Sequence, residues 1–212
     1  MSYYLGLSIL SNNKHGPKPL SAEAWHMVSA LAGRSIAEGD IAREGQGRPY
    51  FVDRGADFNI SHSGALAAVS LVCGANLRTG CDVELVRKRP RAQAIAEEFF
   101  SVPERDYVLF QEHFIEERFL EIWTLKECFL KLRGLSVFDM TQVPSFIHDG
   151  DFAFDALVAV PLNFYLYELS GANERYILAT AIEGGGGHRQ PEIRRFSQEP
   201  LDCRCIAGIV RA

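Results

Sequence analysis

The segment from Arg118 to Gly134 constrains the fold most, because its apolar residues repeat at helical spacing while charged residues interrupt the repeat. At about 100° per residue, the apolar side chains of a helix with this spacing share one broad arc. The arc contains Phe119, Ile122, Trp123, Leu125, Phe129, Leu130 and Leu132. Glycine commonly ends a helix. The pattern therefore predicts a largely buried helix that stops at Gly134.

Charged residues lie within this arc or beside it. Lys126 and Arg133 fall inside it, Glu127 lies at its edge, and Lys131 follows one turn later on the same side. A charge on a buried helix needs an internal partner or a ligand. The helix alone leaves both explanations open. For Arg133, a paired or snorkelling side chain near the helix end is the favoured interpretation.

A predicted strand carries two further carboxylates, Asp82 and Glu84, in the run Gly-Cys-Asp-Val-Glu-Leu. Alternate residues of a strand share a face, so both side chains can converge on one ion. The solvated face of an edge strand explains the same pattern. With Glu127 as a third carboxylate, an all-oxygen ligand set suits Mg²⁺ and phosphoryl transfer.

Three other residues could contact a phosphate. Ser61 and His62 follow a predicted strand, where they either donate hydrogen bonds to a phosphate or cap their own turn. A hydrolase built on this Ser-His pair is disfavoured, since neighbouring strand residues point apart and the sequence lacks a G-x-S-x-G elbow. Arg48, between Gly47 and Pro49, either binds a phosphate or lies in a surface turn.

Charge and hydropathy exclude several classes of protein. The net charge of -5 over 212 residues argues against nucleic acid as a partner. The sequence starts without a basic signal region and has no apolar run near the roughly eighteen residues of a membrane span, so a cytoplasmic location is expected.

The five cysteines are scattered, which favours reduced thiols. A basic run at 87–91 is either a solvated face or an attraction for an acidic partner.

The predicted elements fall into one α+β pattern used twice. Strands are expected at 3–10, 58–60, 66–72, 80–86, 152–160, 163–169 and 175–183, and helices at 21–37, 92–100, 103–111 and 114–133. The strands between 58 and 86 are expected to form an antiparallel meander. We expect an N-terminal α+β lobe at 1–86, a C-terminal α+β lobe at 87–183, and a flexible tail at 184–212 with an edge strand near 192–196.

Four motifs together resemble a known family. They are Gly47-Arg48-Pro49, Phe58-Asn-Ile-Ser61-His62-Ser63, Gly80-Cys-Asp82-Val-Glu84 and Trp123-Thr-Leu-Lys126-Glu127-Cys-Phe-Leu-Lys131. In this order, over residues 47–135, they closely resemble the 4′-phosphopantetheinyl transferases of the Sfp type. The resemblance implies a pseudo-dimer of two similar lobes, each an antiparallel sheet packed with helices, with the active site between them. Such a chain completes its own site, so a monomer is expected.

The resemblance also implies an activity, the Mg²⁺-dependent transfer of the 4′-phosphopantetheine arm of coenzyme A to a serine of an apo acyl, peptidyl or aryl carrier protein, releasing 3′,5′-ADP. Asp82, Glu84 and Glu127 would hold Mg²⁺, and Glu127 or a water on the metal would take the serine proton. Lys131, supplemented by Lys126, would sit on the pyrophosphate. Three residues, namely Arg48, Ser61 and His62, would anchor the phosphates of the nucleotide end.

The chain departs from the family pattern in its predicted first helix, where His26 and Arg34 are the available basic residues for the 3′-phosphate. Two other functions remain open. One is a catalytically silent module that binds coenzyme A or a carrier protein. The other is a Mg²⁺-dependent phosphoester hydrolase, such as a nuclease or phosphatase. The sequence does not indicate which carrier or pathway is served.

Overall fold

The computed structural model describes residues 1–10, 17–110, 112–154, 160–171, 173–184, 190–197 and 199–211. Its strands are β1 (Ser2–Ile9), β2 (Ile41–Glu44), β3 (Arg48–Phe51), β4 (Ala56–Ser63), β5 (Leu66–Cys73), β6 (Arg78–Leu85), β7 (Ile147–His148), β8 (Asp151–Phe152), β9 (Leu162–Gly171), β10 (Glu174–Glu183), β11 (Glu192–Arg195) and β12 (Leu201–Arg211). Its helices are α1 (Pro17–Ala32), α2 (Ala92–Phe99), α3 (Val102–Leu109) and α4 (Ile115–Arg133), with 3-10 turns at Glu38–Asp40, Glu112–Phe114 and Val137–Gln142.

Two four-stranded sheets form the centre of the protein. The first has the order β11-β1-β5-β4 and the second the order β12-β9-β10-β6. Neighbouring strands are antiparallel, except that β11 runs parallel to β1. The pairs β2-β3 and β7-β8 form two small hairpin sheets. The structure thus confirms a mixed fold of antiparallel sheets and helices.

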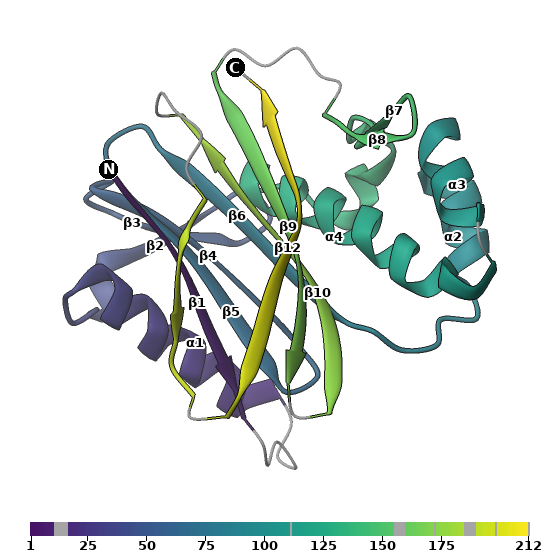
Figure 1. The fold of residues 1–212 in the computed structure, drawn as a ribbon. Helices are drawn as coiled ribbons and strands as arrows, with labels where there is room; N and C mark the ends of the chain where they lie inside the picture. The colour runs from purple at the N-terminus through teal and green to yellow at the C-terminus, as the bar shows by residue number, and fades with distance from the viewer. Residues whose placement is uncertain are drawn as a thin grey trace.

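The sheets and helices stack in four layers. Alternate side chains of β1, β5, β6, β9 and β10 meet in a core between the two sheets, because successive residues of a strand point to opposite faces. Helix α1 packs on the outer face of the first sheet, and α4, with α2 and α3, covers the outer face of the second. In Figure 1, α1 lies on one side of the strands and α2, α3 and α4 lie on the other.

Most predicted elements are present, with shifted ends. Helix α1 starts at Pro17, before the expected Ser21. It ends at Ala32 because Gly33 adopts a left-handed φ of 66°, before the expected end at residue 37. Strands β2, β3 and β12 were not predicted, and residues 155–159 of the expected strand at 152–160 lie outside the described residues. The expected edge strand near 192–196 is confirmed as β11.

The expected meander is wrong in its third strand. Strand β6 pairs along its length with β10 in the second sheet, while β4 and β5 pair in the first. Strand pairing also links the two ends of the chain, since β11 lies beside β1. Three expectations therefore stay predictions. They are the division into lobes at 1–86 and 87–183, the relation of the lobes as a pseudo-dimer, and a separate tail at 184–212.

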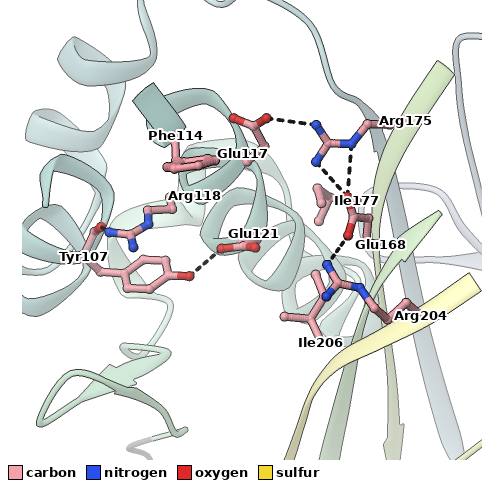
Figure 2. A pocket seen from close by; sticks show the side chains of 10 residues that line it. All are labelled: Tyr107, Phe114, Glu117, Arg118, Glu121, Glu168, Arg175, Ile177, Arg204 and Ile206. Carbon is pink, nitrogen blue, oxygen red and sulfur yellow. Dashed lines mark hydrogen bonds and ion pairs between the residues drawn. The ribbon is translucent and has the colours of Figure 1, made fainter. Parts of the chain in front are cut away.

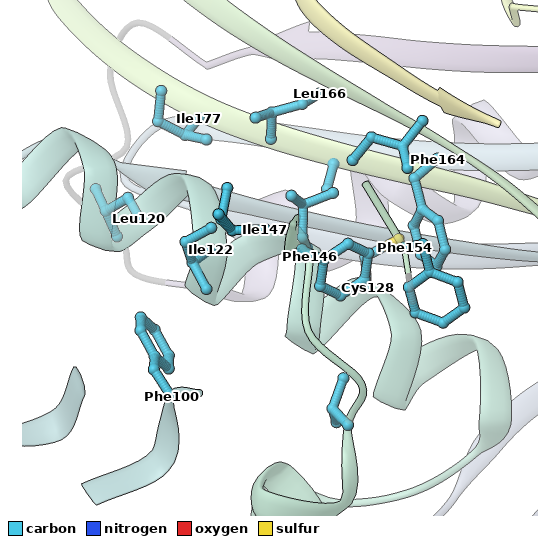
Figure 3. Packing of buried hydrophobic residues seen from close by; sticks show 14 of the residues in the cluster. Phe100, Leu120, Ile122, Cys128, Phe146, Ile147, Phe154, Phe164, Leu166 and Ile177 are labelled. Carbon is cyan, nitrogen blue, oxygen red and sulfur yellow. The ribbon is translucent and has the colours of Figure 1, made fainter. Parts of the chain in front are cut away.

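Helix α4 ends as predicted, and its buried face anchors it to the second sheet. Gly134 has a φ of 68°, and the N–H groups of Gly134 and Leu135 donate to the carbonyls of Lys131 and Leu130, which forms a Schellman cap. Phe146 and Phe164 pack edge to face beneath it, at 4.9 Å between ring centres. Figure 3 shows these rings with side chains of the surrounding apolar cluster.

Gly80 lets α4 approach β6 closely. A Cβ atom at this position would lie 2.5 Å from the Cys128 carbonyl oxygen and 3.0 Å from the Leu132 Cβ. Only a residue without a side chain fits there. The glycine of the acidic strand motif thus brings the helix with Glu127 and Lys131 against the strand with Asp82 and Glu84. No helix in the described part of the chain is long and apolar enough to span a membrane.

Candidate functional site

Strand β4 holds the edge of β6 through a ladder of side chains. Its alternate residues Asp57, Asn59, Ser61 and Ser63 accept hydrogen bonds from the backbone N–H groups of Thr79, Cys81, Val83 and Leu85, at 2.8, 3.1, 3.2 and 3.0 Å. Every rung joins residues 22 apart in the sequence, so β4 and β6 run in fixed register. A buried N–H left without an acceptor costs about 1–3 kcal/mol. The ladder therefore takes the place of a backbone partner on this edge of β6.

Asp82 lies at the centre of the candidate site, with one oxygen bonded and one free. Its Oδ1 accepts from the Lys131 ammonium at 2.6 Å and from the Ser61 hydroxyl at 3.0 Å. The same ammonium also donates to Ser61 Oγ at 2.9 Å. Asp82 is only 4% exposed, and its Oδ2 is buried with no hydrogen-bond partner among the described residues. A buried carboxylate oxygen without a partner is costly, so this oxygen is suited to a ligand.

Lys131 remains a cation at this position. Burial by itself acts to lower the pKa of Lys131, but the charge of Asp82 and the hydrogen bond between them outweigh burial and raise that pKa. The Lys131 side chain as a whole is 30% exposed, so it can also meet a ligand from solvent. A positive charge thus stands beside the free oxygen of Asp82.

Glu84, two residues further along β6, is held in a similar way, by a serine hydroxyl and a cation. The Ser63 hydroxyl donates to Glu84 Oε2 at 3.2 Å, and Arg89 donates to the same oxygen at 2.6 Å. Arg89 belongs to the basic run at 87–91, so at least one residue of that run pairs with the site instead of serving only as a solvated face.

Glu127 faces these carboxylates from α4. Burial, followed by the nearby charge of Asp82, raises the pKa of Glu127 to about 7, while Lys131 acts against the shift and Glu84 adds to it. The four charged groups therefore influence one another across the contact of α4 with β6. A carboxyl group with a pKa near 7 can accept or release a proton at neutral pH.

A pocket of about 190 Å³ opens beside Lys131. It is lined by Gln46, Gly47, Arg48, Pro49, Asn59, Ile60, Lys131, Gly134 and Leu135. The loop before β3 closes one side, where the Gln46 N–H donates to the Gly134 carbonyl at the end of α4. Three of the four sequence motifs therefore meet at one hollow, namely Gly47-Arg48-Pro49, the motif at 58–63 and the motif of α4.

The carboxylates of Asp82, Glu84 and Glu127 are suitable ligands for a hard divalent cation, although they are not arranged as a preformed metal site. Across the described residues, no three Asp, Glu, His or Cys side chains are already gathered as such a site. Asp82, Glu84 and Glu127 nevertheless offer oxygen ligands alone, as Mg²⁺ prefers. Within the described part of the chain Asp82 Oδ2 has no hydrogen-bond partner, and, in addition to burial, the charges of Asp82 and Glu84 both raise the pKa of Glu127. Both observations agree with a cation site among these three carboxylates. We judge that these residues fit the metal.

Comparison with known proteins gives the relatives of the chain. Residues 78–181 match the model of the 4′-phosphopantetheinyl transferase superfamily. The 4′-phosphopantetheinyl transferase AcpT of Escherichia coli K12 is 31% identical over 142 residues, 65% of this chain and 71% of AcpT. The chain belongs to the 4′-phosphopantetheinyl transferase superfamily. The predicted resemblance is thereby confirmed at the level of the superfamily.

Other members of the superfamily match over shorter spans. A Haemophilus influenzae protein with the provisional name 4′-phosphopantetheinyl transferase is 34% identical over 63% of this chain, and the match spans 57% of that relative. The 4′-phosphopantetheinyl transferase psf-1 of Bacillus pumilus is 37% identical over 53% of this chain and 47% of its own length. The chain thus matches about half the length of these two relatives.

Among the predicted site residues, the structure brings Ser61, Asp82, Glu84, Glu127 and Lys131 together, but it gives Arg48 a buried partner. The Arg48 guanidinium donates to both oxygens of Asp57, at 3.0 and 2.5 Å. It also donates to the carbonyls of Thr79 and Lys131. Arg48 lines the 190 Å³ pocket, so phosphate binding stays a prediction, although its hydrogen bonds are already used within the protein.

Lys126 has internal partners of its own, and its expected role beside Lys131 stays a prediction. Its side chain is 1% exposed and pairs with Glu104 of α3 at 3.1 Å. It also donates to the carbonyls of Val143 and Pro144. The charge of Lys126 in the apolar arc is therefore explained by internal pairing. Arg133 is likewise paired, with Glu183 at 2.5 Å, as the favoured interpretation held.

His62 stands between Ser61 and Ser63 on β4, and its side chain is exposed. Because alternate strand residues face opposite sides, it points away from the two serines of the ladder. A role for His62 at a phosphate or in catalysis stays a prediction.

Sequence reasoning missed Asp57, Ser63 and Arg89. For Asp57 and Ser63 the sequence held a partial signal. Positions 57, 59, 61 and 63 are all polar, and Phe58 and Ile60 between them are apolar. Such a period indicates a strand with one polar face. It could not show that this face meets the edge of β6 instead of solvent.

A second pocket, of about 350 Å³, lies at the other end of α4 and differs in chemistry (Figure 2). There Arg175 pairs with Glu117 at 3.1 Å and with Glu168 at 2.7 Å. Arg204 also pairs with Glu168. The charges of this pocket compensate one another, unlike the free oxygen of Asp82 in the candidate site.

Proposed function

We propose that this protein is a 4′-phosphopantetheinyl transferase of the Sfp type that moves the phosphopantetheine arm of coenzyme A to a serine hydroxyl of an apo carrier protein. The observation that carries the proposal is the meeting of Asp82, Glu84, Glu127 and Lys131 beside a pocket, in a chain of this superfamily. Relatives of the chain are named 4′-phosphopantetheinyl transferases, which supports the same reaction.

Asp82, Glu84 and Glu127 would hold Mg²⁺, which would neutralise charge on the pyrophosphate of coenzyme A. The serine oxygen forms a bond to the phosphorus of the phosphopantetheine phosphate, and the bridging P–O bond breaks. The leaving group is 3′,5′-ADP. Positioning and charge stabilisation account for most of the catalysis in reactions of this type.

Glu127, or a water on the metal, would take the proton from the attacking serine. Lys131 places its positive charge on the phosphate that departs. The pocket of about 190 Å³, which Arg48 lines, would receive the nucleotide end. Ser61 and His62 remain the predicted anchors of its phosphates.

The test is to incubate the protein with coenzyme A, Mg²⁺ and apo carrier proteins of the acyl, peptidyl and aryl classes, and then to weigh the carriers. We expect at least one carrier to gain a phosphopantetheine arm. Glu127→Gln should nearly abolish the gain while the circular dichroism spectrum is retained. No gain on any carrier would sink the proposal.

The same assay separates the other two functions. A silent binding module would be stabilised by coenzyme A in a thermal shift measurement and yet modify no carrier. A phosphoester hydrolase would release 3′,5′-ADP without a carrier. A transferase releases it in step with carrier modification.

A further inference from the structure

Two serines of β4 do more than complete the ladder. Ser61 accepts the Val83 N–H and donates to Asp82, while Ser63 accepts the Leu85 N–H and donates to Glu84. Each hydroxyl thus ties one point of the β6 backbone to the carboxylate of the preceding residue. The other two rungs, from Asp57 and Asn59, lead to no such carboxylate.

This arrangement limits the freedom of both acids. A carboxylate can rotate about two side-chain bonds in Asp and three in Glu, and each added hydrogen bond selects among those rotamers. The bonds at Asp82 all fall on Oδ1, which leaves Oδ2 free and buried. At Glu84 the serine and Arg89 share Oε2. In both residues one oxygen is anchored, and the other accepts no hydrogen bond from the part of the chain that the structure describes.

We infer that Ser63, together with Ser61, is a positioning residue that presents the carboxylates of β6 to a divalent cation. The inference rests on the proposed function for the identity of the cation site. Outer partners that orient metal ligands typically affect affinity by about 10–100-fold. Ser63 is the sharper probe, since Ser61 also contacts Lys131.

Threonine and valine provide a matched pair at position 63. They have the same shape, both suit a strand, and only threonine keeps the hydroxyl. Mn²⁺ is titrated into the full-length chain without coenzyme A, and the free ion is followed by electron paramagnetic resonance. We expect Ser63→Val to weaken Mn²⁺ binding about 10-fold, and Ser63→Thr to bind as the wild type does.

Asn59→Ala serves as the control for the ladder itself. It removes the acceptor of the Cys81 N–H without touching a carboxylate contact, so it should lower the melting temperature and leave the Mn²⁺ affinity unchanged. Equal affinities for Ser63→Val and Ser63→Thr would overturn the inference, as would a wild type that binds no Mn²⁺. If the wild type transfers the arm and the two variants bind Mn²⁺ equally, only the inference fails. If the wild type binds Mn²⁺ and modifies no carrier, the proposed function fails instead.

Discussion

Arg48 and Asp57 form a buried bidentate ion pair where the two sheets meet. Its two N–O distances are 3.0 and 2.5 Å, and the Arg48 side chain is only 3% exposed. The same guanidinium reaches the Lys131 carbonyl on α4 and the Thr79 carbonyl on β6. One side chain thus joins the hairpin of β3 to the strand and the helix that carry the candidate site.

Arg48→Met should lower the free energy of unfolding by about 3 kcal/mol, because it leaves Asp57 buried without its charge partner. Chemical denaturation measures this value. The double variant Arg48→Met/Asp57→Asn should recover more than half of the loss, since asparagine is neutral and still accepts the Thr79 N–H. Unchanged stability combined with a large rise in KM for coenzyme A would mean that Arg48 is chiefly a phosphate ligand.

Lys131→Met should lower kcat by about 100-fold, a loss typical of removing one group that stabilises transition-state charge. The reason is that its ammonium is the cation beside Asp82 and the pocket. Steady-state kinetics with an apo carrier that the wild type modifies separates kcat from KM. We also expect a larger loss of kcat than in Arg48→Met, measured on folded protein. The opposite ranking would place the reacting phosphate elsewhere along the substrate.

The sequence predicted the central helix well because one helix face and one glycine cap are local signals. Helix α4 occupies Ile115–Arg133 and ends at Gly134 with the expected left-handed turn. The acids of β6 were also identified, since alternation along a strand is local. Their meeting with Glu127 depended on a long-range contact, for which Gly80 gives the physical reason.

Partners distant in the sequence could not be predicted in the same way. Lys126 and Lys131 both looked available for a phosphate, yet Lys126 pairs with Glu104 and Lys131 with Asp82. Strand β6 left the expected meander because its N–H groups on one edge are satisfied by side chains of β4. A pattern of residue types does not distinguish a side-chain ladder from an ordinary backbone ladder.

Lys126→Met offers a structural counterpart to Lys131→Met on the same helix. Glu104 is fully buried, and the loss of its ammonium partner should lower the free energy of unfolding by about 3 kcal/mol. The Ser101 and Phe146 N–H groups still donate to Glu104, so we expect the fold to persist. Activity per folded molecule should stay within about threefold of the wild type, because the pair lies apart from Asp82.

The comparison of Lys126→Met and Lys131→Met is decisive for the role of Lys126. Thermal denaturation and kinetics are measured on both variants under the same conditions. A large fall in kcat for Lys126→Met without a loss of stability would support the predicted role of Lys126 at the phosphate.

Glu127 should make the stability of the metal-free protein depend on pH. Its pKa is raised from an ordinary 4.5 to about 7, first by burial and then by Asp82. Between these two values the folded state holds a proton that the unfolded state has released, so stability falls as the pH rises through the window. The shift corresponds to at most about 3 kcal/mol. Urea denaturation in EDTA at pH 5 and pH 8 measures the fall.

Glu127→Gln carries no such titration, so its pH dependence should be smaller than that of the wild type. The two proteins should have similar stability at pH 5, and the variant should be the more stable one at pH 8. Adding Mg²⁺ at pH 8 should stabilise the wild type by mass action and the variant much less. Parallel pH profiles for the two proteins would show that burial and the charge of Asp82 do not raise the pKa of Glu127. A wild type that is less stable than Glu127→Gln at pH 8 would instead support a Glu127 carboxylate that is charged there despite its burial and the nearby charge of Asp82.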